Sequence, residues 1–110
     1  MSTPEGKVKA RVKTLLKQRG AYWHMPVQNG MGAPALDFHV CHRGRYAGVE
    51  TKAPGKKPTA RQTLTANEIA AAGGAIFFID GDEGLKELAT WMEGIESESL
   101  SGPQEGSAAL

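Results

Sequence analysis

Asp37, Glu50 and Lys52 have the side-chain types and the spacing that phosphate chemistry requires. Apolar and polar residues alternate over 36–42, and residues 46–52 also have the character of a strand. A strand period of two puts Glu50 and Lys52 on one face, and the short Arg-Gly-Arg connection favours an antiparallel hairpin that brings Asp37 beside them. Two carboxylates and an ammonium group on one sheet face suit a divalent cation and a phosphate ester.

Hydrolysis of a phosphodiester needs an attacking hydroxide, neutralised phosphate charge and an in-line leaving oxygen. Carboxylate oxygens of Asp37 and Glu50 favour Mg²⁺ or Mn²⁺ over zinc, and the backbone carbonyl of Thr51 is a candidate further ligand. Metal binding lowers the pKa of a bound water. In this hypothesis Lys52 orients the nucleophilic water and stabilises the pentavalent phosphate.

Other interpretations of these residues stay open at this point. Glu50 and Lys52 can form an ordinary surface ion pair on a strand. His39 and Cys41 share a face and are potential zinc ligands, but the sequence offers no second ligand pair beside them. His24 is expected to be structural or to contact a substrate.

Length and composition favour one small domain. The chain has 110 residues, 40% of them hydrophobic, and one cysteine, Cys41, which excludes an internal disulfide and fits a reducing compartment. No apolar run approaches the roughly 20 residues of a membrane span, and the N-terminus lacks a signal-peptide pattern. We therefore expect a cytoplasmic protein.

Charge is distributed unevenly along the chain. Up to Gln62 there are twelve basic and three acidic residues, whereas beyond it there are one basic and nine acidic residues. Such polarity favours a polyanion bound by the N-terminal part. The alternative is a basic helix that is merely solvated.

The sequence pattern predicts helix, three strands, helix, strand, helix. We expect a helix over 4–19, strands over 21–27, 36–42 and 46–52, a helix over 59–72, a strand over 75–79 and a helix from Asp82, as its cap, to 95. A loop over 28–35 leads into the first acid. This order indicates an α/β domain with a mixed sheet over residues 1–95, followed by a disordered acidic tail over 96–110.

Two residues on the predicted helices point toward the same chemistry. Glu5 falls within the apolar stripe of the first helix, so it points inward, although an acid there also favours the helix N-terminus. Thr59 and Gln62 have the spacing of a capping box, while Gln62 is also a candidate to hold water or a phosphate oxygen. The basic residues nearby suit DNA backbone phosphates: Lys56, Lys57 and Arg61.

Asp37 followed by Glu50-Thr51-Lys52 matches the D…E-x-K pattern of the PD-(D/E)xK nuclease superfamily. Accompanying features make the chain resemble the VRR-NUC group, the virus-type replication-repair nucleases, in its small stand-alone phage form, over residues 4–80. These features are the acid-bearing first helix, the Gly-Pro loop before Asp37, Gly44-Arg45, Lys52-Ala53-Pro54-Gly55, and the Gln62 helix ending in Ala-Gly-Gly. The family's Pro-Asp pair is replaced by Pro34-Ala35-Leu36-Asp37.

This resemblance implies a restriction-endonuclease-like core and assigns roles to individual residues. Asp37 and Glu50 would bind the metal, Lys52 would be the catalytic lysine, and Gln62 would be the helix glutamine near the site. Glu5 would join the metal shell directly or through water.

We therefore expect a Mg²⁺- or Mn²⁺-dependent DNA endonuclease, phage-encoded and selective for branched DNA such as junctions or flaps. Paired cuts on a junction need two active sites, so a homodimer is expected. Arg43 and Arg45 are further candidate DNA contacts. The ranked alternatives are a non-catalytic DNA-binding module or nuclease subunit with the same fold, and then a sequence-specific restriction-type nuclease.

Overall fold

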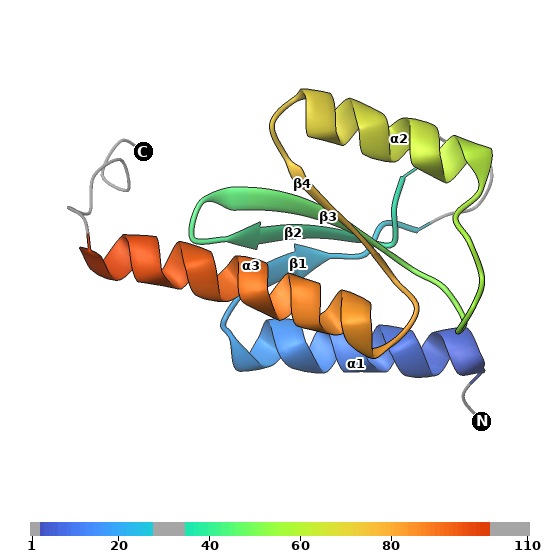
Figure 1. The fold of residues 1–110 in the computed structure, drawn as a ribbon, viewed down its shortest axis with the longest axis horizontal. Helices are drawn as coiled ribbons and strands as arrows, with labels where there is room; N and C mark the ends of the chain where they lie inside the picture. The colour runs from blue at the N-terminus through green and yellow to red at the C-terminus, as the bar shows by residue number, and fades with distance from the viewer. Residues whose placement is uncertain (1–2, 28–34, 102–110) are drawn as a thin grey trace.

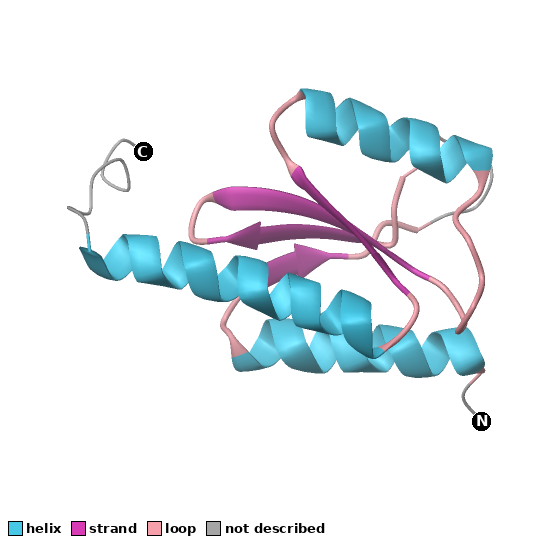
Figure 2. Ribbon diagram, in the orientation of Figure 1, coloured by secondary structure: helices cyan, strands magenta, loops and turns pink. Residues whose placement is uncertain are grey.

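A mixed β-sheet lies between helices on both of its faces (Figure 1, Figure 2). The computed structural model describes residues 3–27 and 35–101, and within them four strands form one sheet in the order β1-β2-β3-β4. The first three strands are antiparallel and β4 is parallel to β3. The elements are α1 (Pro4–Gln18), β1 (Tyr22–His24), β2 (Phe38–His42), β3 (Arg45–Thr51), α2 (Ala60–Ala71), β4 (Ala75–Ile79) and α3 (Asp82–Ser101). This confirms the predicted α/β class and element order.

Helix α1 begins and ends where its sequence dictates. The Thr3 side chain caps it by accepting a 2.9 Å hydrogen bond from the Gly6 N–H, and Gly20 follows its end with a φ of +75°. Its apolar stripe packs against the sheet in one core with α3. That core contains Val8, Val12, Leu16, Phe38, Val40, Ala47, Val49, Ile79, Leu88 and Met92.

The hairpin of β2 and β3 carries the acidic residues of interest. Its turn consists of Arg43 and Gly44, whose φ angles of 51° and 85° are both positive, as a type I′ turn requires. The expected alternation begins at Phe38, where β2 starts. Leu36 is therefore not on the face of Phe38: it lies over Gly48 on the opposite side of the sheet, next to Ile69 of α2.

Helix α2 connects the parallel strands β3 and β4 and covers this opposite side. A side chain at Gly48 would meet Ile69 and Leu36 at 3.0 Å, so the glycine allows α2 to approach the sheet closely. Thr59 caps α2 in the predicted capping box with Gln62.

Helix α3 is longer than expected, and this corrects the expected start of the tail at residue 96. It continues to Ser101 because its acidic residues find partners elsewhere in the fold. Glu93 and Glu96 accept hydrogen bonds from Arg19, and Glu96 also contacts the buried His42 at 2.8 Å. Residues 102–110 of the expected tail and residues 28–34 of the expected loop lie outside the described residues.

The expected start of α3 also needs correction. Asp82 does not precede the helix as its cap but is its first residue, and its carboxylate pairs with Arg11 on α1. Trp91 of α3 packs against Phe77 of β4 with 5.6 Å between ring centroids.

The uneven charge of the sequence is partly neutralised inside the molecule. Acidic residues of α3 pair with arginines of α1 and β3: Arg11 with Asp82, Arg19 with Glu93 and Glu96, and Arg45 with Glu98. The basic N-terminal half is therefore not one continuous surface for a polyanion. Within the described part of the chain, none of the helices combines the length and the apolar character that a bilayer crossing would require.

Candidate active site

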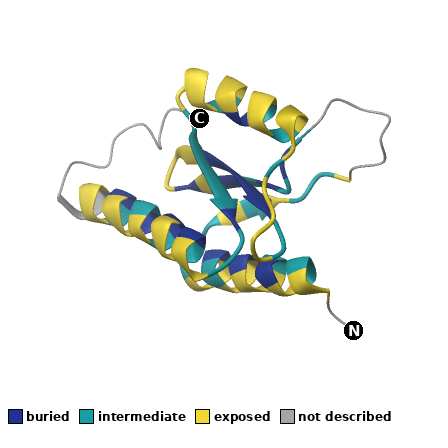
Figure 3. Ribbon diagram, turned by 45° about the vertical axis from the view of Figure 1, so that its right-hand side comes forward, coloured by how far each residue is buried: buried dark blue, intermediate teal, exposed yellow. Residues whose placement is uncertain are grey.

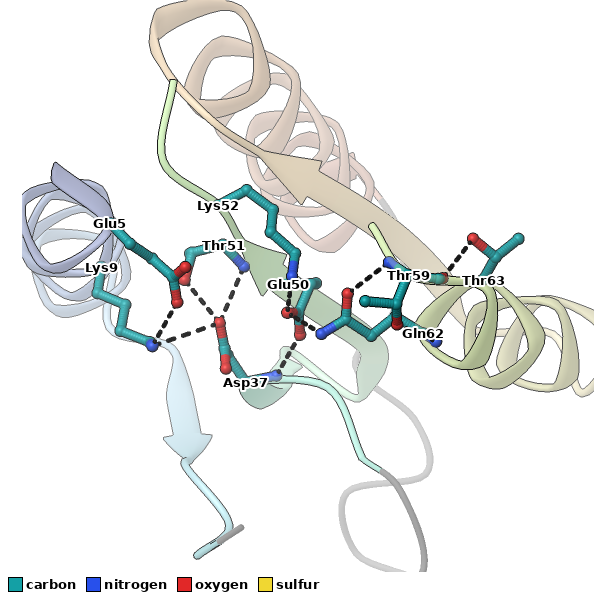
Figure 4. Close-up of polar contacts among 9 residues, drawn as sticks. All are labelled: Glu5, Lys9, Asp37, Glu50, Thr51, Lys52, Thr59, Gln62 and Thr63. Carbon is teal, nitrogen blue, oxygen red and sulfur yellow. Dashed lines mark hydrogen bonds and ion pairs between the residues drawn. The ribbon is translucent and has the colours of Figure 1, made fainter. Parts of the chain in front are cut away.

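Asp37 lies at the entrance to β2 and is fixed by the last residue of β3 (Figure 4). Its Oδ2 accepts hydrogen bonds from the backbone N–H of Thr51 at 3.0 Å and from the Thr51 hydroxyl at 2.6 Å. Because Thr51 is fully buried, this donor pair is held rigidly by the sheet. The Asp37 carboxylate is therefore set in one orientation beside the end of β3.

Glu50 is the buried centre of the cluster, with 3% of its surface exposed. One carboxylate oxygen, Oε1, accepts the backbone N–H of Asp37 at 3.1 Å. The other, Oε2, accepts the Gln62 amide at 2.6 Å and lies 3.6 Å from the Lys52 ammonium nitrogen. The structure thus brings Asp37, Glu50, Lys52 and Gln62 together from two strands, the following loop and α2 (Figure 4).

Negative charge is in excess around Glu50. Burial, followed by the nearby charge of Asp37 and more weakly that of Glu5, raises the pKa of Glu50 from 4.5 to about 7. The hydrogen bond from the Asp37 backbone and the charge of Lys52 oppose this shift without cancelling it. An additional cation beside this carboxylate would stabilise its charged form.

Lys9 is a member of the cluster that the sequence analysis missed. Its ammonium group lies 3.1 Å from Glu5 Oε2 and 3.7 Å from Asp37 Oδ2, so it bridges the two acids. Burial alone lowers the pKa of Lys9, but the hydrogen bond to Glu5 and the charges of Asp37, Glu5 and Glu50 outweigh it and the pKa is raised. The i,i+4 spacing of Glu5 and Lys9 was the available signal.

Glu5 itself reaches the cluster through this lysine. It lies in the first turn of α1, as the interpretation based on the helix N-terminus requires, and its side chain points toward Asp37 and Thr51 (Figure 4). Both interpretations of Glu5 are thus compatible with its position.

Gln62 forms the predicted capping box with one end of its amide and contacts Glu50, instead of a substrate or water, with the other. Its Oε1 accepts the Thr59 backbone N–H at 2.9 Å in the capping box, and its Nε2 donates to Glu50. The start of α2 is therefore tied directly to the carboxylate, and Gln62 positions Glu50 rather than pointing freely toward a substrate.

Because Gln62 bonds both to Thr59 and to Glu50, replacing Gln62 should lower the free energy of unfolding more than replacing Thr59. We expect Thr59→Ala to lower the free energy of unfolding by about 1 kcal/mol, the usual cost of a lost cap. Gln62→Ala should cost about 1–3 kcal/mol more, because it also removes a donor from a buried carboxylate. Urea unfolding of both variants at one pH measures the two free energies of unfolding. Equal losses in the two variants would contradict a stabilising hydrogen bond between Gln62 and Glu50.

A recess lined by basic residues lies next to the cluster. Lys52, Lys56 and Lys57 line it together with Pro58, Phe78, Ile79 and Asp80, and its volume is about 150 Å³. The loop around it is shaped by Gly55, whose φ is +81° and whose N–H donates to Asp80. Lys56 and Lys57 therefore lie next to the cluster, as contacts to neighbouring phosphates require.

The other expected DNA contacts are placed differently. Arg61 is exposed in the first turn of α2, next to Gln62. Arg43 and Arg45 lie at the turn of the hairpin, at the end of β3 opposite to Thr51, and Arg45 is paired with Glu98. At about 3.3 Å per residue, this puts the two arginines roughly 20 Å from the carboxylates.

The donor set fits a hard divalent cation that keeps part of its water shell. The carboxylates of Asp37 and Glu50 supply oxygen donors, and the excess of negative charge around Glu50 favours a cation there. In the part of the chain that the structure describes, no group of three or more His, Cys, Asp or Glu side chains could hold a metal ion as a cage of protein ligands. Mg²⁺ does not need such a cage, since it binds through one or two carboxylates, waters and substrate phosphates.

Comparisons with known proteins bear on the fold. No family model matches the sequence, and no curated protein matches it. A solved structure described as "VRR_NUC domain" matches this chain with a TM-score of 0.70 and 23% sequence identity, covering 81% of this chain and 97% of that one. The protein therefore shares the fold of a VRR_NUC domain, as its sequence motifs indicated.

Proposed function

Given a VRR_NUC-type fold that gathers two carboxylates and a lysine, we propose that this protein is a Mg²⁺- or Mn²⁺-dependent DNA endonuclease. The observation that supports it best is Glu50, a buried carboxylate whose pKa is raised to about 7 and which is contacted by Asp37, Lys52 and Gln62. A buried acid with an excess of negative neighbours is costly, and such sites are typical of function.

Each residue has a task that follows from its contacts. Asp37, Glu50 and the Thr51 carbonyl would hold the metal ion, with Glu5 joining directly or through water. The bound ion supplies positive charge for the phosphate and lowers the pKa of a water molecule. Lys52 orients the attacking water and stabilises the charge that develops on the phosphate, and Gln62 keeps Glu50 in place.

The DNA backbone follows the positive charge beside the cluster. Lys56, Lys57 and Arg61 contact phosphates next to the cleaved one, which positions the DNA without reading its sequence. Because a domain of this size offers little surface for base readout, selectivity comes from the shape of branched DNA such as junctions or flaps. Paired cuts on such DNA need a homodimer. We propose that the reaction serves phage replication, recombination or repair in the host cytoplasm, because the sequence resembles the small stand-alone phage form.

Cleavage assays on matched substrates test this proposal. We expect a labelled four-way junction and a flap to be cut with Mg²⁺ or Mn²⁺, a linear duplex of the same sequence to be cut more slowly, and none of them to be cut in EDTA. Retained binding without cleavage under any metal condition would contradict the nuclease and would favour the non-catalytic DNA-binding module. Equal rates on branched and linear DNA would contradict the selectivity.

A further inference from the structure

Helix α2 lies on one side of the sheet, and α1 and α3 lie on the other (Figure 3). Trp23, Phe38 and Val40 pack on the core side. By strand alternation, Tyr22, His24, His39 and Cys41 point to the other side, the side of α2. Tyr22 is 69% exposed, and His24 and Cys41 are exposed as well. Among the described elements, α2 is the helix on this side and packs on β3 and β4, whereas β1 and β2 carry the exposed rings.

These side chains form rows that lead to the candidate active site. Strand pairing aligns Tyr22 with Cys41 and Cys41 with Tyr46 in one row, and His24 with His39 and His39 with Gly48 in the next. Because side chains of one face recur every second residue, Tyr46, Gly48 and Glu50 follow one another on this face of β3. Tyr46 and Glu50 therefore lie on the same face of β3, with Leu36 and Ile69 packed over Gly48 between them.

The rings are held in defined orientations before any ligand binds. His39 stacks on His24 with 6.4 Å between centroids and 20° between planes, and it contacts the Tyr46 ring at 5.9 Å. His39 Nδ1 and the Tyr46 hydroxyl form a 2.5 Å hydrogen bond. Tyr46 is fixed in turn against Gly74, where an added Cβ would lie 2.9 Å from its ring. Tyr22 extends the row outward from this supported group.

Charge along the same strands suits a polyanion. β1, β2 and the part of β3 before Glu50 contain no acidic residue, as the sequence of these described strands shows. Arg43, in the turn, lies at the far end of these strands and Asp37 with Glu50 at the near end, whereas Arg45 points to the opposite side of the sheet and pairs with Glu98 of α3. Flat rings with polar edges match nucleobases better than they match an apolar protein surface.

We propose that this surface, defined by Tyr22, His24, His39 and Tyr46, stacks unpaired nucleobases next to the phosphate that is cleaved. This inference rests on the proposed nuclease function and deepens it, because it identifies what distinguishes a branched substrate: bases released from the duplex. Stacking is tolerant of base identity, so the surface selects unpaired DNA without reading its sequence.

The test measures stacking without cleavage. A flap DNA with 2-aminopurine in its unpaired arm is titrated with the protein in EDTA, and base fluorescence and anisotropy are recorded. We expect Tyr22→Ala to weaken binding of the unpaired arm by about 5- to 150-fold and to remove the fluorescence change. Tyr22→Phe should retain both, since it keeps the ring. Leu64→Ala removes a side chain of similar exposure, 61%, from α2 and should change neither.

Each result decides for or against the surface. An unchanged affinity and fluorescence signal in Tyr22→Ala would overturn the proposal. So would a loss of affinity that follows a change from dimer to monomer in light scattering, because the face would then be a contact between two copies. The protein could also show a fluorescence change that depends on Tyr22 and yet cut no DNA with any metal. This result would support the stacking surface and contradict the proposed nuclease activity.

Discussion

Lys52→Ala is expected to abolish detectable cleavage, with a loss of at least about 10²–10³-fold in the single-turnover rate, while the variant folds and binds branched DNA. Lys52 is 3.6 Å from Glu50, with 17% of its side chain exposed, so its position is well defined. Removing it takes away the donor that meets the charge developing on the phosphate. Rates on a labelled junction with Mg²⁺, binding in EDTA and circular dichroism measure the three properties separately.

Two controls isolate this role of Lys52. Lys56→Ala removes the same kind of side chain from the adjacent recess and should weaken binding with little effect on the single-turnover rate at saturating protein. Lys52 also lowers the pKa of Glu50, so its loss shifts that carboxyl further toward its protonated form. Repeating the assay at pH 9 separates the two effects. Recovery of the rate there would show that Lys52 acts through Glu50 and not on the phosphate.

The metal-free protein is expected to lose stability as the pH rises from 5 to 8. The pKa of Glu50 is about 7 in the folded protein and near its ordinary 4.5 when unfolded, so the folded state binds the proton more tightly between these values. The free energy of unfolding therefore falls as the pH rises through this window, by up to about 3 kcal/mol from this group. Added Mg²⁺ should restore stability more at pH 8 than at pH 5, because it replaces the proton as the counter-charge.

Urea unfolding across this pH range, with EDTA or with Mg²⁺, measures the effect. Glu50→Gln should flatten the pH slope in EDTA and remove most of the response to Mg²⁺. Glu5→Gln is the matched control, since Glu5 is more exposed and should leave the slope in place. An unchanged Mg²⁺ response in Glu5→Gln would return Glu5 to its simple role at the helix N-terminus. A pH slope that survives in Glu50→Gln would contradict the assignment to Glu50.

Local sequence signals were sufficient for the hairpin and the cap. Alternation over 38–42, the Arg43-Gly44 turn and the T-x-x-Q spacing each act within a few residues, so they predict structure without knowledge of the rest of the fold. The meeting of Asp37 with Glu50 follows from that hairpin. The motif that resembles the VRR-NUC group is contained in the same segment, which is why the fold could be anticipated from it.

Such local signals could not predict contacts between segments that are far apart in the sequence. The bridging position of Lys9 depends on how α1 packs against the end of β3. The Gln62–Glu50 hydrogen bond depends on the approach of α2 over Gly48. Helix α3 extends beyond Ile95 because Glu96 finds Arg19 and His42, which lie more than fifty positions earlier in the chain.

The two-residue turn of Arg43 and Gly44 fixes the alignment of the whole hairpin. A shift of one residue between β2 and β3 would send every side chain of β3 to the opposite side, with Thr51 in the place of Glu50. The arrangement of the carboxylates is thus decided at the far end of the sheet, by backbone angles that favour glycine at position 44. A single inserted residue in that turn would therefore move Glu50 away from Asp37.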